Sequence, residues 1–146
     1  MKSSRSLLLA LVALLISALP ALAGSWGDNY KNALATAAQE NKKILLDFTG
    51  SDWCGWCMKL KQETFDQSQF KGFAANNLVL VEIDFPHSKS LSPEVAQQNA
   101  ALKEQYHVGG FPTLVLLDSQ GNIIKQHSGY IAGGPKAFID WVNSGK

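Results

Sequence analysis

The apolar side chains of this 146-residue chain follow two spacings, which alternate along the sequence and predict helices and strands in turn. Spacings of three and four residues predict helices at 28–41, 53–64, 66–75, 93–106 and 135–142. Asp28 is the expected N-cap of the first helix. Ser92 is the expected N-cap of the fourth, with Pro93 in its first turn. Short apolar runs, too brief for helices, predict strands at 43–48, 78–84, 113–117 and 123–127.

The order of these elements predicts an α/β fold. Strands that alternate with helices pair in parallel through right-handed crossovers. The last two strands are joined by a turn at 119–122, so we expect them to form an antiparallel β-hairpin. The sequence therefore predicts a mixed central sheet with helices on both faces, a C-terminal β-hairpin and a last helix, all within one domain at residues 24–146.

Residues 1–23 have the pattern of a cleaved secretory signal peptide. Two basic residues precede an apolar run at 7–19, and these 13 residues are short for a membrane span of about 20. Small residues at 21 and 23 then form a cleavage site. We expect a periplasmic or secreted protein; an uncleaved N-terminal anchor is the alternative.

Composition excludes several classes of protein. With 46% hydrophobic and 17% charged residues, the chain is too apolar and too weakly charged to be disordered. Its 13 basic and 12 acidic side chains form no basic excess, so we expect no nucleic-acid partner. Residues 1–23 carry two of the basic side chains and no acidic one, so the predicted mature chain has a net charge of −1.

The two cysteines of the chain, Cys54 and Cys57, form a C-x-x-C pair at the start of a predicted helix. Unpaired N–H groups and the positive end of the helix dipole stabilise a thiolate at that place. The thiolate is the attacking species in disulfide exchange. A second cysteine one turn further on can attack the mixed disulfide formed at the first. This pattern favours Cys54 as nucleophile and Cys57 as resolving cysteine.

Three other interpretations of the pair remain open. It could be a structural disulfide, although a closed loop of four residues stabilises a fold less than a longer loop does. It could be half of a zinc site, although the three histidines lie 20 residues apart, at 87, 107 and 127. It could also hold copper(I) between two thiolates, as in a metallochaperone or another binding module without turnover.

The residues around this pair resemble the thioredoxin superfamily. Residues 44–48 and 53–57 resemble its first core strand and active-site loop, and residues 110–113 resemble its cis-proline loop. The W-C-x-W-C form is most similar to exported bacterial thioredoxin-like proteins. The resemblance implies a thioredoxin-like fold and a thiol–disulfide oxidoreductase with no cofactor or metal. It also implies protein or peptide disulfide and thiol substrates, a membrane-bound or soluble thiol redox partner, and a monomer.

The same resemblance assigns roles to single residues. Pro112 is expected to be cis and to lie against the cysteines, with Phe111 before it contacting substrate or packing in the core. Asp47 resembles a buried carboxylate that moves a proton to or from the resolving thiol. One more residue separates Asp47 from Cys54 than is usual in the superfamily. The alternative for Asp47 is therefore a strand-end side chain bonded to nearby backbone.

The aromatic residues beside the cysteines are expected to differ in their positions. Trp56 would form an apolar docking surface together with Gly55, whereas Trp53 is expected to pack inward on the sheet. Gly55 and Trp56 place no charge between the cysteines, which favours a reductant over an oxidant. The segment at 85–106 is longer than in a minimal thioredoxin, and either shapes substrate choice or lengthens a surface helix.

Overall fold

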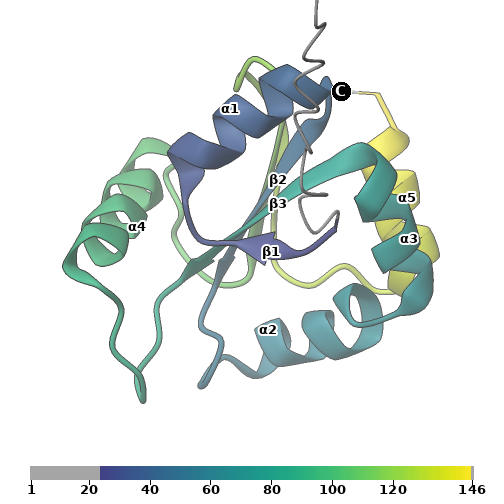
Figure 1. Cartoon of the computed structure of the whole chain (residues 1–146). Helices are drawn as coiled ribbons and strands as arrows, with labels where there is room; N and C mark the ends of the chain where they lie inside the picture. Colours follow the sequence, from purple (N-terminus) through teal and green to yellow (C-terminus); the bar gives the residue numbers. More distant parts are fainter. Residues whose placement is uncertain (1–23, 146) are drawn as a thin grey trace, which may run out of the picture.

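The computed structural model describes residues 24–145, so the signal peptide predicted at 1–23 lies outside the described residues. Along the chain the elements are β1 (Trp26–Gly27), α1 (Tyr30–Glu40), β2 (Lys43–Thr49), α2 (Gly55–Leu60), the π-helix η1 (Lys61–Phe65), α3 (Ser68–Asn77), β3 (Leu78–Asp84), α4 (Pro93–Gln105), β4 (Thr113–Leu117), β5 (Ile123–Ser128) and α5 (Gly134–Asn143) (Figure 1).

The strands form one mixed sheet in the order β1-β3-β2-β4-β5. β1 and β2 both run parallel to β3, whereas β4 is antiparallel to β2 and to β5. The predicted α/β fold, with parallel crossovers followed by a terminal hairpin and helix, is confirmed. Because β2 lies in the middle of the sheet, the active-site loop that follows it begins at the centre of one sheet edge.

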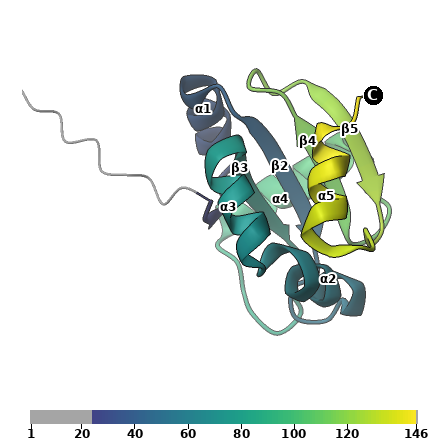
Figure 2. The ribbon, with the colours of Figure 1, turned by 90° about the vertical axis from the view of Figure 1, so that its right-hand side faces the viewer.

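Helices cover both faces of the sheet, and the alternation of side chains along β2 separates two apolar cores. Ile44, Leu46 and Phe48 pack with α1 and α4 on one face. Leu45 faces the other side, where Phe70 of α3 and Phe138 of α5 pack against it. Figure 2 shows α3 and α5 in front of the sheet and α4 behind it.

Two predicted helix starts are wrong. The N-cap of α1 is Asn29, whose side chain accepts a hydrogen bond from the Asn32 N–H at 2.8 Å, and not Asp28. The helix predicted at 53–64 begins at Gly55, with Cys54 as N-cap, and changes to π geometry at Lys61. In both places the helical period of the side chains extends beyond the residues that have helical backbone hydrogen bonds.

The short strand β1 was not predicted, because two residues carry no detectable alternation. Its Trp26 pairs with Leu80 of β3, and its indole ring lies 5.0 Å from the ring of Phe65. Tertiary contacts therefore create this strand, which adds one edge strand to the sheet next to β3.

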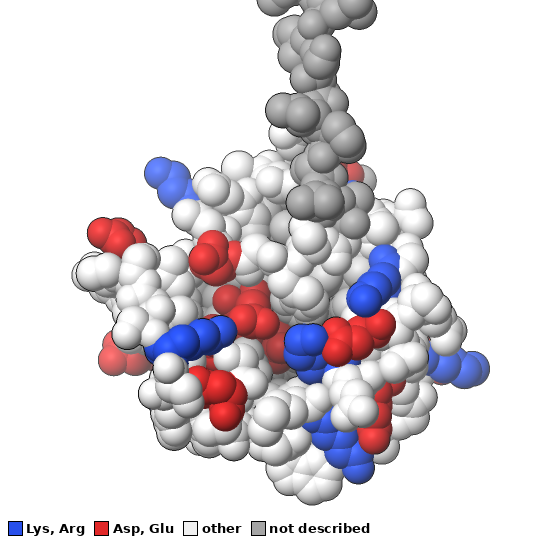
Figure 3. Space-filling model, turned by 60° about the horizontal axis from the view of Figure 1, so that its bottom comes forward, with Lys and Arg blue, Asp and Glu red and all other residues white. Residues whose placement is uncertain are grey.

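The surface shows no concentration of one charge on the face seen in Figure 3, where Lys and Arg side chains are interspersed with Asp and Glu. Within residues 24–145, none of the helices combines the length and the apolar character needed to cross a membrane.

Candidate active site

The two cysteines lie at the start of α2 and are joined by a disulfide bond. Their Cα atoms are 5.2 Å apart, and Cys54 Sγ accepts a hydrogen bond from the Cys57 N–H at 3.2 Å. Both side chains are largely buried, with 7% of Cys54 and 5% of Cys57 exposed. Because a hydrogen bond to a sulfur favours its charged form, this contact stabilises a thiolate at Cys54 once the disulfide is reduced.

Trp53 does not pack inward as expected. Its side chain is 42% exposed and stacks on His87, with ring centroids 4.5 Å apart. The indole N–H donates a hydrogen bond to the Phe85 carbonyl at 2.7 Å. A side chain at Gly50 would collide with the indole ring, so the absence of a Cβ there allows this position. Trp53 therefore connects the active-site loop to the loop that follows β3.

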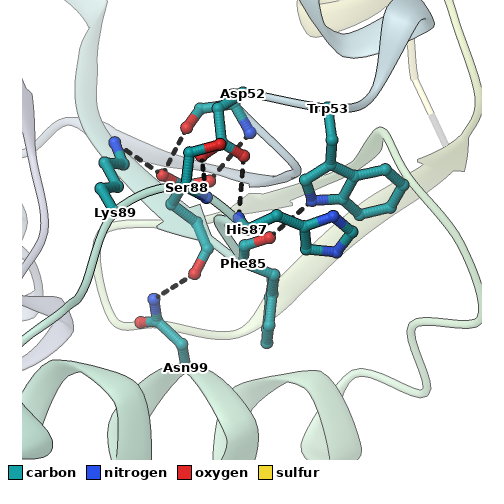
Figure 4. A network of polar contacts seen from close by, with 9 residues as sticks. Asp52, Trp53, Phe85, His87, Ser88, Lys89 and Asn99 are labelled. Atoms are coloured by element: carbon teal, nitrogen blue, oxygen red, sulfur yellow. Dashed lines mark hydrogen bonds and ion pairs between the residues drawn. The ribbon is translucent and has the colours of Figure 1, made fainter.

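Asp84, at the end of β3, ties these two loops together, and Figure 4 labels its partner Lys89 in this polar network. Its carboxylate accepts hydrogen bonds from the Ser51 N–H at 2.9 Å and the Ser51 hydroxyl at 2.6 Å, and Lys89 lies 2.9 Å away. Burial raises the pKa of Asp84, but the hydrogen bonds from Ser51 and Lys89 outweigh it and hold the pKa below its ordinary value. Asp84 thus remains ionised and holds Ser51 in place.

Asp52 makes a second connection between the same loops. Its carboxylate accepts hydrogen bonds from the backbone N–H groups of His87 at 2.9 Å and Ser88 at 2.6 Å, and these bonds lower its pKa. This network was not predicted, because Asp84 and Asp52 lie 33 to 36 residues along the chain from their partners in the facing loop. Polar residues in a predicted loop carry no signal of the distant partners that they meet.

Asp47 lies on the face of β2 that carries α2, and it lines one cavity with Cys57. It is 8% exposed, and its Oδ1 accepts no hydrogen bond from residues 24–145. Burial, followed by the charges of Glu82 and Asp84, raises the pKa of Asp47 to about 8. Backbone bonding at the strand end, the alternative considered for this residue, does not satisfy that oxygen. Asp47 is therefore mostly protonated at neutral pH.

A cavity of about 30 Å³, enough for a water molecule, is lined by both Asp47 and Cys57. Glu82 and Lys61 line the same cavity. Glu82 is the register partner of Asp47 on β3, and burial together with the Asp84 charge raises its pKa. Glu82 was not predicted as a site residue. The alternation of β3 places it on the face of Leu80, but only the pairing of β2 with β3 sets it opposite Asp47.

Phe111 and Pro112 lie at the same edge of the sheet as the cysteines, since Phe48 of β2 pairs with Thr113 of β4. The peptide bond between Phe111 and Pro112 is cis. The Phe111 ring stacks on Phe85 at 5.1 Å and meets Trp53 edge-on at 5.9 Å. The Phe111 side chain is partly buried against the core under α1 and α4, and the rest of it is exposed to solvent.

Trp56 lies on the other side of the pair and is 59% exposed. Its ring is 5.5 Å from that of Tyr130, and Lys59 Nζ lies 5.3 Å from both ring centroids. The Tyr130 hydroxyl donates a hydrogen bond to Glu63. A side chain at Gly55 would meet no atom of the described residues within 4 Å, so the surface between the cysteines is open.

In the part of the chain that the structure describes, no group of three or more His, Cys, Asp or Glu side chains could hold a metal ion. The histidines have separate neighbours: His87 stacks on Trp53, and His127 meets Trp141 edge-on at 6.2 Å. The described side chains therefore do not complete the zinc site considered from the sequence.

Comparison with known proteins gives consistent matches. Residues 30–146 match the family described as thioredoxin-like domain. The chain is 42% identical over 117 residues to a protein named disulfide bond reductase DsbH from Chlamydia pneumoniae, covering 80% of this chain and 70% of the relative. It is 29% identical over 97 residues to the thiol:disulfide interchange protein DsbD of Pseudoalteromonas atlantica, covering 66% of this chain but 15% of that protein. A solved structure described as DsbH oxidoreductase superimposes with a TM-score of 0.75 at 41% identity, covering 81% of each chain.

Proposed function

The chain belongs to the thioredoxin-like domain family, and from that premise we propose that it reduces disulfide bonds in other proteins, with Cys54 as nucleophile and Cys57 as resolving cysteine. The fold, the C-x-x-C pair and the similarity to DsbH identify it as a thiol–disulfide oxidoreductase. The observation that carries the assignment of roles is the hydrogen bond from the Cys57 N–H to Cys54 Sγ. It stabilises negative charge on the first sulfur of the pair.

The reaction takes place in two exchange steps. The Cys54 thiolate attacks one sulfur of the substrate disulfide, which forms a mixed disulfide and releases the other substrate sulfur as a thiolate. The Cys57 thiolate then attacks Cys54 Sγ, which releases the second substrate thiolate and forms the Cys54–Cys57 disulfide. Two electrons pass to the substrate, and an external dithiol must reduce the pair again.

Asp47 supplies the proton transfer that the second step needs. Cys57 must lose its proton before it attacks, and the nearby carboxyl shares a cavity with it that has room for a water molecule. Because the pKa of Asp47 is raised to about 8, the minority of Asp47 that is ionised at neutral pH is basic enough to take the Cys57 proton. Glu82 lines the same cavity and can pass that proton on toward solvent.

Substrate contacts are assigned to the surface on both sides of the pair. Phe111 and Pro112 lie on one side, where an extended substrate segment can pair with backbone as in strand addition. Trp56 and Gly55 lie on the other, where an exposed ring beside an open surface provides an apolar contact. The monomer assembles this surface without a second copy.

The protein is proposed to work outside the cytoplasm. Support comes from the signal-peptide pattern of residues 1–23 and from the relatives, whose names belong to disulfide reductases and interchange proteins. An oxidising compartment removes electrons from a dithiol. A membrane-bound or soluble thiol partner must therefore return them to Cys54 and Cys57.

Two single-cysteine variants test the roles. Cys57→Ser should accumulate mixed disulfides with an insulin-type substrate, because the step that releases product is lost. Cys54→Ser should form none and should have no reductase activity. Non-reducing electrophoresis and insulin reduction measure both results. If Cys54→Ser keeps full activity, or if both variants trap substrate equally, the assignment is wrong.

A further inference from the structure

The segment 85–92 is held against the active-site loop by contacts at several points. Asp52 binds the N–H groups of His87 and Ser88, and Trp53 binds the Phe85 carbonyl. The Phe85 N–H in turn donates to the Thr49 carbonyl at 2.9 Å. A surface loop with no task beyond connection does not need this many anchors, whereas a binding wall benefits from being fixed before its ligand arrives.

Helix α4 is bonded to the residue that directly precedes this segment. The Asn99 side chain, 1% exposed, donates a hydrogen bond to the Asp84 carbonyl at 2.9 Å (Figure 4). The segment and α4 therefore form two walls, and the segment contacts the active-site loop at Asp52 and Trp53.

A hollow of about 470 Å³ lies between these walls. It begins at Trp53 and Phe111, which flank the redox pair, and its lining is mostly apolar. Phe85, Ala100 and Lys103 also line a second hollow, of about 610 Å³, which continues along α4 to Glu104 and His107. The two hollows form one groove that leads away from the cysteines.

Charge in the first hollow is not balanced within the protein. The Lys89 ammonium is neutralised by Asp84. Lys103 forms no ion pair with the described residues, and its Nζ lies 6.0 Å from the ring centroid of Phe85 and 5.9 Å from that of Phe111. A cation held over two aromatic faces, next to an apolar hollow, is complementary to a carboxylate that arrives beside an apolar side chain.

We propose that this hollow is a specificity site for the polypeptide substrate, which places an apolar side chain between the 85–92 segment and α4 and an acidic side chain on Lys103. The inference rests on the proposed disulfide exchange at Cys54, because that reaction brings a polypeptide to this edge of the sheet. The long segment at 85–106 then shapes substrate choice, the first of the two alternatives that its length suggested.

The test uses the reduced protein and two peptides, each with one cysteine activated as a pyridyl disulfide. Both peptides carry one leucine two positions before the cysteine and another two positions after it. The residue that follows these leucines is aspartate in one peptide and lysine in the other. Dithiodipyridine, which has neither peptide nor charge, serves as reference. Release of pyridinethione gives second-order rates, and each peptide rate is divided by the reference rate of the same variant.

The wild type should react about tenfold faster with the acidic peptide than with the basic one, and Lys103→Glu should reverse that preference. Lys71→Glu on α3 makes the same change in charge at an exposed position outside the groove and should keep the preference. Ala100→Phe should slow both peptides relative to the reference. Ala101→Phe, the neighbouring exposed alanine that does not line either hollow, should not.

Other results would overturn either the specificity site or the proposed function. Equal rates for the two peptides, or equal effects of Lys103→Glu and Lys71→Glu, overturn the specificity site and leave disulfide exchange intact. Failure of the wild type to react with dithiodipyridine contradicts the proposed function itself. A wild-type dimer that Ala100→Phe dissociates in analytical ultracentrifugation would assign the hollow to a second copy of the chain, and would overturn its assignment to substrate.

Discussion

Asp47→Asn is the substitution for which the structure predicts the most specific effect. It replaces a buried carboxyl by an amide of nearly the same shape that cannot ionise. Burial, Glu82 and Asp84 raise the pKa of Asp47 to about 8, from an ordinary value of 3.8. Between pH 3.8 and about 8, the unfolded chain has lost the Asp47 proton, whereas the folded protein still holds it. The stability of the wild type therefore falls as pH rises from about 4 to about 8.

The difference in stability between the wild type and Asp47→Asn follows from the distance between the folded and unfolded pKa values of Asp47. One unit of pKa difference corresponds to about 1.4 kcal/mol, so the wild type should lose about 1.4 kcal/mol per pH unit relative to Asp47→Asn. At pH 7, about three units above the ordinary pKa, the accumulated difference is about 4 kcal/mol, a large part of the stability of a domain of this size. The variant should be the more stable protein at neutral pH, although it lacks the carboxyl that we propose for proton transfer.

Urea unfolding of the oxidised proteins, at several pH values between about 5 and 8, measures this difference. Asp140→Asn is the matched control, because Asp140 lies on the surface and pairs with Lys136 at 2.7 Å. Its difference from the wild type should not vary with pH over that range. If the difference between Asp47→Asn and the wild type is also independent of pH, Asp47 is ionised in the folded protein and the proposed proton transfer loses its basis.

Three further substitutions test the packing and the contacts around the site. Ser92→Ala removes the N-cap of α4, whose hydroxyl accepts the Val95 N–H at 3.2 Å, and should lower the free energy of unfolding by about 1 kcal/mol in urea. A loss well above that value would mean that Ser92 does more than cap the helix. Phe138→Ala empties a fully buried position between α5 and the sheet and should lower the free energy of unfolding by about 3–5 kcal/mol, measured by the shift of the urea midpoint. A loss below 1 kcal/mol would contradict this packing. Asp84→Asn weakens the bonds to Ser51 and Lys89, and because the pKa of Asp84 is lowered in the folded state, its contribution is present at neutral pH and lost as pH falls below about 4. The variant should therefore be destabilised by about 2 kcal/mol at pH 7 and by less in acid, and equal destabilisation at both pH values would contradict the ionised state of Asp84.

Local patterns account for the elements that were predicted correctly. β2 and β3 were predicted because short, largely apolar stretches, K-I-L-L-D-F and L-V-L-V-E-I-D, are too brief for a helix and suit buried strands. The start of α4 was predicted because serine followed by proline suits both an N-cap and a first turn. The pairing of Cys54 with Cys57 followed in the same way, since residues three apart at a helix start must lie close together.

The surroundings of the redox pair could not be predicted in this way, because they depend on strands and loops that meet only after folding. Pairing of Asp47 with Glu82 places two carboxyls over one cavity, and burial there keeps Asp47 protonated. The position of Trp53 is decided by a loop more than 30 residues further along the chain, which offers His87 for stacking and the Phe85 carbonyl as acceptor.

The sequence by itself determined the chemistry, because two thiols at C-x-x-C spacing in a helix start need no distant partner to form a redox couple. Only the tertiary structure decided which groups surround that couple and which surface lies open beside it. Protonation depends on burial and on neighbouring charges, and a groove needs two walls from different parts of the chain. Neither property exists until β2, β3 and α4 are brought together.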